Sequence, residues 1–240
     1  MKMFSDQPIY KRVRITENLS SKNEISMKEF IAKTITFLIC PFIAYGFGLA
    51  VYRVIAVAAL LKQTLTAFAV GFVLFVIFWR IFKRHLQVVC TFEHELTHLL
   101  FGLMFLKRPH SFVVTRHDGG SVTLSSGNFL ITLAPYFFPT VSYLLLPFAY
   151  FVPKNGMPVF VALLGGTVAF HLVSTWAELH WQQTDLHKAG ILFSVLFLPV
   201  ANLVFYGALA ALVFGGVHGF SSFWITGARE SLVPLATLFN

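Results

Sequence analysis

Long apolar blocks separated by short polar stretches make up most of the chain. Each block is of the length needed to cross about 30 Å of hydrocarbon as a helix, which takes about 20 residues. The pattern therefore predicts an all-α, multi-pass membrane protein with about six membrane segments. These blocks are residues 35–61, 65–82, 88–106, 129–151, 159–176 and 191–214.

A short stretch after the third block has the alternation of a β-hairpin instead. Residues 112–115 and 121–124 are rich in β-branched residues, and Asp118-Gly119-Gly120 lies between them. An Asp-Gly pair between two such runs is a strong signal for a tight hairpin turn. The sequence thus predicts a small β-hairpin directly after a membrane helix.

Composition supports the membrane interpretation and excludes other classes. The chain is 57% hydrophobic and 12% charged, whereas soluble domains carry about 25% charged residues. The net charge of +8 does not indicate nucleic-acid binding, because the basic residues flank the apolar blocks, as membrane topology requires. Cys40 and Cys90 form neither a disulfide framework nor a CxxC pair.

The distribution of lysine and arginine predicts how the chain is oriented in the membrane. If all six segments cross the membrane, more lysine and arginine residues lie on the side of the N-terminus than on the other side. The N-terminus is therefore expected in the cytoplasm. In a bacterial cell the location would be the cytoplasmic (inner) membrane. The predicted regions are a polar tail (1–33), two membrane helices (34–87), a core of further membrane segments (88–214) and a short C-terminal tail (215–240).

The third block contains the pattern His-Glu-x-x-His at His94, Glu95 and His98. On a helix, residues four apart project from one face, so both imidazoles can reach one tetrahedral zinc ion. Glu95, beside the first histidine, is placed to accept a proton from a zinc-activated water and to return it to a leaving amine. Acidic residues in an apolar helix cost about 2.5 to 3.5 kcal/mol each at its centre, which favours a functional role.

A catalytic zinc ion usually has three protein ligands, so the sequence must supply one more. Residues 176–187, just before the sixth block, concentrate the candidates, of which Asp185 is favoured. Glu178, His180 and His187 remain alternatives, and Asp185 has a competing explanation as a helix N-cap. His171, alone in the fifth block, is interpreted as a helix contact.

These features together resemble the site-2-protease family of intramembrane zinc metallopeptidases, in a compact form without a PDZ domain. The resemblance covers roughly residues 93–202: the HELTH motif, Gly119-Gly120 followed by Val122-Thr123, Leu133-Ala134-Pro135-Tyr136, and Thr184-Asp185-Leu186. It implies that an aspartate, here Asp185, completes the zinc site, and that a peptide bond in or near a membrane-embedded substrate helix is hydrolysed. The family's common Asn-x-x-Pro and Leu-Asp-Gly signature is absent.

Other functions fit parts of the pattern. A zinc hydrolase acting on a lipidated peptide or a lipid amide would use the same motif. A non-catalytic metal-binding membrane protein or transporter is a second alternative, although a transporter should show paired repeats. The partners expected for the peptidase are a membrane-protein substrate and the lipid bilayer, with no oligomeric state specified.

Six straight spans conflict with Asp185 as a ligand. With a helix starting near residue 88, His94 lies about 9 Å below one membrane surface at 1.5 Å per residue. Six simple spans would place Asp185 near the opposite surface, across about 30 Å. The three prolines within residues 129–151 suggest that this block is broken or re-entrant.

Overall fold

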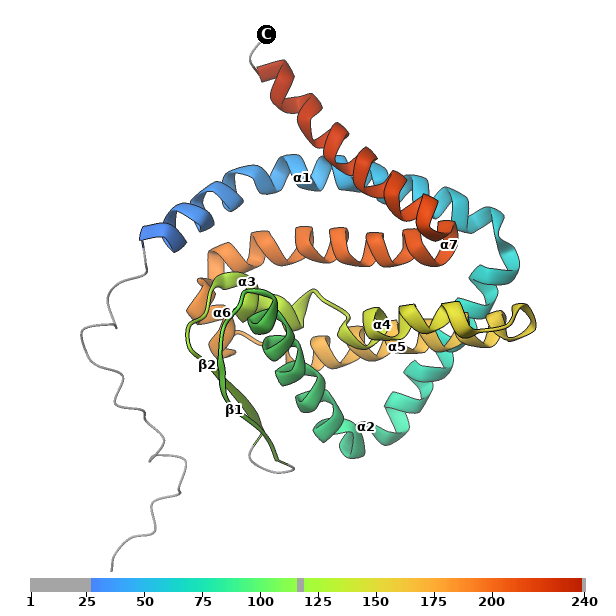
Figure 1. The fold of residues 1–240 in the computed structure, drawn as a ribbon, viewed down its shortest axis with the longest axis horizontal. Coiled ribbons are helices and arrows are strands. Elements are labelled where there is room, and N and C mark those ends of the chain that lie inside the picture. The colour runs from blue at the N-terminus through green and yellow to red at the C-terminus, as the bar shows by residue number, and fades with distance from the viewer. Residues whose placement is uncertain (1–26, 116–118, 239–240) are drawn as a thin grey trace, which may run out of the picture.

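A computed structural model describes residues 27–115 and 119–238. Helices dominate these residues, and a two-stranded antiparallel sheet is the only sheet among them. The predicted all-α class with one small hairpin is therefore confirmed for the described part of the chain (Figure 1). The elements are α1 (Met27–Leu60), α2 (Lys62–Met104), β1 (Pro109–Val114), β2 (Gly120–Leu124), α3 (Phe129–Leu133), η2 (Ala134–Tyr136), α4 (Thr140–Leu145), η3 (Leu146–Phe151), η4 (Lys154–Gly156), α5 (Met157–Glu178), α6 (Thr184–Ala189) and α7 (Ile191–Leu238).

The hairpin lies where the sequence placed it. Phe112 pairs with Val122, and Val113 pairs with Ser121. Gly119 has a positive φ of 79°, which glycine adopts at little cost. Strand β2 begins at Gly120, so the connection covers residues 115–119 and is longer than the predicted Asp-Gly turn; Asp118 lies outside the described residues.

The second and third apolar blocks form one helix. Helix α2 continues through residues 83–87, where the sequence suggested a loop, and its two halves diverge like the arms of a V in Figure 1. Glycines allow α5 to pack closely on the first arm. A Cβ on Gly165 would lie 2.1 Å from the carbonyl oxygen of Phe68, and such close approach is typical of helices packed in membranes.

The sixth block continues well beyond residue 214. Gly216 has φ 59° and ψ −157°, a left-handed conformation that reverses the chain and favours glycine. The following residues form a second helical arm that crosses α1 and packs against it (Figure 1), where Phe47 packs on Phe223. The short C-terminal tail expected for residues 215–240 is therefore helical up to Leu238.

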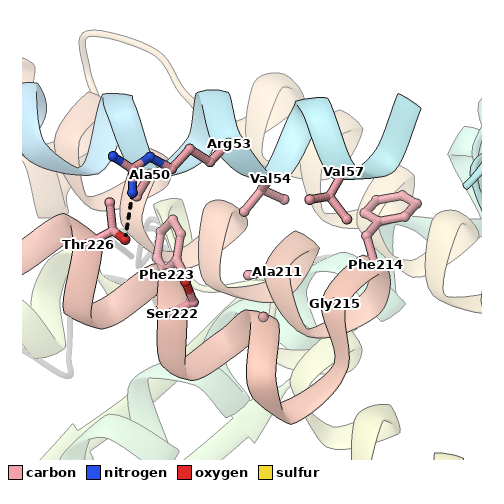
Figure 2. A pocket seen from close by; sticks show the side chains of 11 residues that line it. Ala50, Arg53, Val54, Val57, Ala211, Phe214, Gly215, Ser222, Phe223 and Thr226 are labelled. Carbon is pink, nitrogen blue, oxygen red and sulfur yellow. Dashed lines mark hydrogen bonds between the residues drawn. The ribbon is translucent and has the colours of Figure 1, made fainter. Parts of the chain in front are cut away.

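The arm after Gly216 and α1 also share a polar contact. Arg53 reaches Oγ1 of Thr226 at 3.4 Å and Glu230 at 3.6 Å. Beside it, Ala50, Val54 and neighbouring residues line a small cavity of about 80 Å³ (Figure 2). The last helical arm is thus held to α1 by both apolar and polar contacts.

The proline-rich fourth block is broken, as its composition suggested. Its two halves, Phe129–Tyr136 and Thr140–Phe151, meet at an angle of 85°. Prolines remove backbone donors and clash with the preceding helical turn, which explains the break. Four of the described helices are long and apolar enough to cross a membrane, or five if this bent pair counts as one span. This count is lower than the about six segments predicted, because α2 joins two of the predicted blocks in one helix.

An aromatic cluster fixes the position of the broken segment. Phe129 packs against Phe193 and Phe197 of α7, and Phe137 contacts Phe197 as well. All four rings are buried. Asn128 caps the start of α3 by accepting a hydrogen bond from the backbone N–H of Ile131. This packing places α3 and the nearby α6 beside the second arm of α2, which carries the His-Glu-x-x-His motif.

Candidate metal centre

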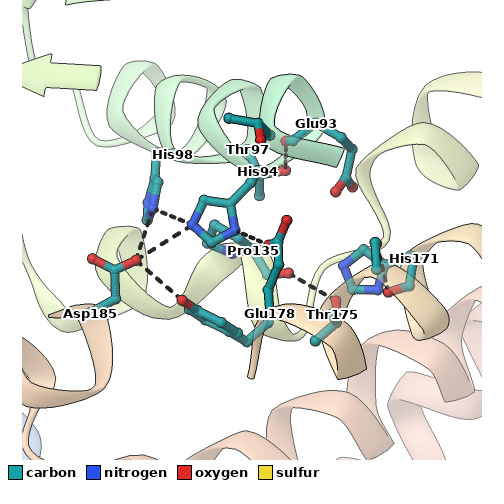
Figure 3. Close-up of polar contacts among 12 residues, drawn as sticks. Glu93, His94, Thr97, His98, Pro135, His171, Thr175, Glu178 and Asp185 are labelled. Carbon is teal, nitrogen blue, oxygen red and sulfur yellow. Dashed lines mark hydrogen bonds and ion pairs between the residues drawn. The ribbon is translucent and has the colours of Figure 1, made fainter. Parts of the chain in front are cut away.

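Three side chains that are far apart in the sequence converge between α2 and α6. Nε2 of His94 lies 3.2 Å from Nε2 of His98. Oδ2 of Asp185 lies 3.5 Å from the first of these nitrogens and 3.4 Å from the second. All three residues are at most 9% exposed, and they form a group of metal-ligand type (Figure 3).

The spacing of these atoms fits a small tetrahedral cation. With zinc–ligand bonds of about 2.0 to 2.1 Å, two ligand atoms of a tetrahedron lie about 3.3 Å apart. The three measured separations are 3.2, 3.4 and 3.5 Å. An ion could therefore be accommodated without rearrangement of the side chains.

The outer ring nitrogens orient the two histidines. Nδ1 of His98 lies 2.8 Å from the carbonyl oxygen of Ile131, which can only accept a hydrogen bond. Nδ1 of His94 lies 2.9 Å from a carboxylate oxygen of Glu178. Both Nδ1 atoms therefore carry the proton, and in neutral imidazoles each Nε2 then presents a lone pair. Two nitrogen lone pairs and a carboxylate oxygen facing one point are a donor set for a cation.

Asp185 is held as a carboxylate by its surroundings. The hydroxyl of Tyr136 donates to its Oδ2 at 3.3 Å, and Nζ of Lys188 lies 3.6 Å from its Oδ1. A hydroxyl donor and an ammonium group both favour the ionised form of a carboxylate. Asp185 is the second residue of α6 and does not cap the helix, whose N-cap is Gln183.

Glu95 faces a cavity in front of the three ligand-type side chains. This cavity, of about 590 Å³, is lined by Glu95, all of β2, and the start of α6. Glu95 is only 9% exposed and packs against the backbone of Gly120, where a Cβ would lie 2.7 Å from its Cγ. A polypeptide lying along β2 would therefore pass directly beside Glu95.

The remaining sequence candidates lie elsewhere. Glu178 contacts the outer nitrogen of His94, on the side away from Asp185. His180 is exposed, and the exposed His187 contacts the carbonyl oxygen of Trp181. His171 contacts the hydroxyl of Tyr206, in line with its interpretation as a helix contact. None of these four belongs to the ligand-type group found among the described residues.

Several supporting groups were missed from the sequence. The carbonyl of Ile131, the hydroxyl of Tyr136 and the orienting role of Glu178 depend on contacts across 33 to 84 residues. Only Glu178 left a sequence signal, since it lies among the polar residues of 176–187. Figure 3 shows Glu178 beside His94 and opposite Asp185.

The contact between Glu178 and His94 leads to a first prediction. Removing the carboxylate that orients a metal-binding histidine typically weakens metal binding by about 10- to 100-fold. We expect a loss of this size in Glu178→Ala, measured by competition for zinc with a chelator. Glu178→Gln, which keeps an acceptor oxygen, should lose much less. Equal affinities of Glu178→Ala and the unaltered protein would contradict the orienting role.

Comparison with known proteins adds no assignment. No family model, no curated protein and no solved structure matches this chain. The donor set His94, His98 and Asp185 could bind a metal ion, and its geometry carries the proposed function.

Proposed function

We propose that this protein is a membrane-embedded zinc metallopeptidase that hydrolyses a peptide bond in or near a transmembrane segment of its substrate. The observation that carries the proposal is the convergence of His94, His98 and Asp185 beside Glu95. The resemblance of the motifs to the site-2-protease family supports the same reaction. A His₂-carboxylate set with room for a water is the arrangement of catalytic zinc sites.

The exposed apolar surface supports a location in the bilayer. None of the most apolar stretch of α2 is buried inside the protein, and only 22% of that of α1 is buried. Exposed surfaces of this kind mark a lipid or protein environment. We propose that these helices span the membrane with the N-terminus in the cytoplasm, in the inner membrane if the cell is bacterial.

The chemistry divides between the bound ion and the protein. His94, His98 and Asp185 would hold the zinc ion, which would supply a bound water of lowered pKa and a Lewis acid for a carbonyl group. Glu95 would accept the proton that the attacking water loses and later deliver it to the leaving amine. Tyr136 and Ile131 keep Asp185 and His98 in place while this happens.

Strand β2 offers a way to hold the substrate. One edge of β2 pairs with β1, while Gly120 to Leu124 also line the cavity with Glu95. A helical substrate has its carbonyl groups hydrogen-bonded internally, so it must unwind before attack. An unwound segment can add to a strand edge through backbone hydrogen bonds, which would bring its scissile bond to the metal centre.

The tight contact at Gly120 leads to a second prediction. In Gly120→Ala, the new methyl group would lie 2.6 Å from Cγ2 of Thr91 and 2.7 Å from Cγ of Glu95, so Glu95 must shift. Since a displacement of about 1 Å in a catalytic group can cost about 100-fold, turnover should fall to that extent while zinc content is unchanged. Gly48→Ala, in α1, is a matched control, because a Cβ there meets nothing within 4 Å and Gly48 does not line the cavity of Glu95. Equal turnover in both variants would argue against the placement of Glu95.

A cleavage assay tests the proposed function. The purified full chain, loaded with zinc in detergent, is incubated with casein, a disordered protein that needs no unwinding, and with a peptide of a single apolar helix. Cleavage that stops on chelation and returns with zinc supports a peptidase. If the protein binds zinc and cleaves model lipid amides but no peptide, a lipid-amide hydrolase is favoured. If it binds zinc and cleaves neither, a non-catalytic metal protein or transporter is favoured.

A further inference from the structure

A second cavity lies on the other side of the metal centre, between α2 and α5. It has a volume of about 570 Å³. Trp79, Lys83 and Gln87 line it at intervals of four residues, so they share one face of α2. Glu178, whose carboxylate orients His94, forms part of the opposite wall from α5. The cavity therefore reaches the support of the metal centre without containing its ligands.

The cavity carries an excess of positive charge. Lys83 and Arg84 both line it and are exposed. Neither forms an ion pair with an acidic side chain in the described part of the chain. Among the described residues that line the cavity, Glu178 is the one acidic residue, and it already contacts His94. Two cations that have no acidic partner among the residues of known position favour an anionic occupant of the cavity.

The end of β2 connects this cavity to the catalytic cavity. Gly120 lines the cavity of Glu95, and the preceding Gly119 lines the basic cavity. Thr91, which also lines the basic cavity, lies beside the Cα of Gly120. A polypeptide that runs along β2 past Glu95 and leaves at Gly120 therefore arrives next to Lys83 and Arg84.

We propose that the basic cavity formed by Lys83, Arg84, Gln87 and Thr91 binds acidic side chains on one flank of the substrate's scissile bond. The inference rests on the proposed peptidase function and names its substrate class: a segment with aspartate or glutamate a few residues from the cleavage point. Hydrogen-bonding side chains in the wall and continuity with β2 favour a peptide over a lipid phosphate as the occupant.

Peptide binding to the Glu95→Gln protein tests the proposal without requiring turnover. Fluorescent peptides of one apolar sequence carry two acidic residues, or their amide counterparts, on either the N-terminal or the C-terminal flank. Because each exposed charge pair changes an equilibrium constant by about 1.5- to 5-fold, acidic residues on one flank should tighten binding about three- to tenfold. The preference should shrink in high salt and disappear when Lys83→Gln and Arg84→Gln are combined.

A charge-matched control separates the cavity from net charge. Lys62 and Lys154 are exposed and line a cavity at the other end of α2, so Lys62→Gln combined with Lys154→Gln should keep the acidic preference. Equal binding of acidic and amide peptides, or a preference that survives loss of Lys83 and Arg84, would overturn the proposal. The proposal would also be overturned if the exchange of Lys83 and Arg84 weakened binding to phosphatidylglycerol nanodiscs but left peptide binding unchanged. Failure of the unaltered protein to cleave any peptide, despite selective binding, would instead refute the proposed function.

Discussion

Replacement of Glu95 by glutamine is expected to lower peptide turnover by about 10²- to 10⁴-fold, the contribution typical of a general base. Glutamine has nearly the same size, so the packing against Gly120 should be kept, but its amide cannot accept a proton from water. Because Glu95 does not belong to the ligand-type group, zinc content should be unchanged. Rates of casein cleavage and zinc content, measured on the same preparation, test both statements.

A second glutamate-to-glutamine exchange controls for a general loss of charge. Glu29 lies near the start of α1 and pairs with Lys33, far along the chain from the motif. Glu29→Gln should therefore cleave at the rate of the unaltered protein. Turnover retained in Glu95→Gln would remove Glu95 from the mechanism, whereas loss of zinc in that variant would point to a structural role.

Replacement of Asp185 by alanine is expected to weaken zinc binding by more than about 100-fold, because it removes a direct donor and outer-sphere partners alone contribute about 10- to 100-fold. The loss leaves His94 and His98 as the two remaining donors of the group. It also frees the hydroxyl of Tyr136 and the ammonium group of Lys188 from their shared partner. Zinc affinity and cleavage should fall together, as measured by chelator competition and by the casein assay.

His187 provides the matched control within the same short helix. It lies two residues from Asp185, is exposed, and contacts the carbonyl oxygen of Trp181. His187→Ala should bind zinc as tightly as the unaltered protein. If zinc were instead lost in His187→Ala and kept in Asp185→Ala, Asp185 would not be the third metal ligand, and one of the other sequence candidates would take that role.

The local part of the site could be predicted because helix geometry determines it. Four residues separate His94 from His98, and any helix places such a pair on one face. The hairpin was equally local, since β-branched runs around Asp118 and Gly119 specify it. Asp185 emerged as a candidate because few acidic residues are available, but its distance from His94 depended on the path of the broken fourth block.

The rest could not be predicted because it depends on tertiary packing. Sequence alone left Glu178 and Asp185 as competing donors, and the structure places them on opposite sides of the imidazole of His94. The reversal of the chain at Gly216 could not be predicted for a similar reason. A glycine permits a positive φ but does not require it, so the helical arm after it depends on packing against α1. The orientation of the N-terminus stays a prediction, since it was counted on six straight spans.

Zinc stoichiometry of the purified full chain tests the central claim most directly. After metal-replete purification in detergent and removal of loosely bound ions, the account predicts one zinc ion per chain, lost when His98 is replaced by alanine. One ion is expected because three donor atoms within 4.8 Å of one another serve a single site. Absence of zinc from the unaltered protein, or retention of zinc in His98→Ala, would contradict the metal centre and with it the proposed hydrolysis.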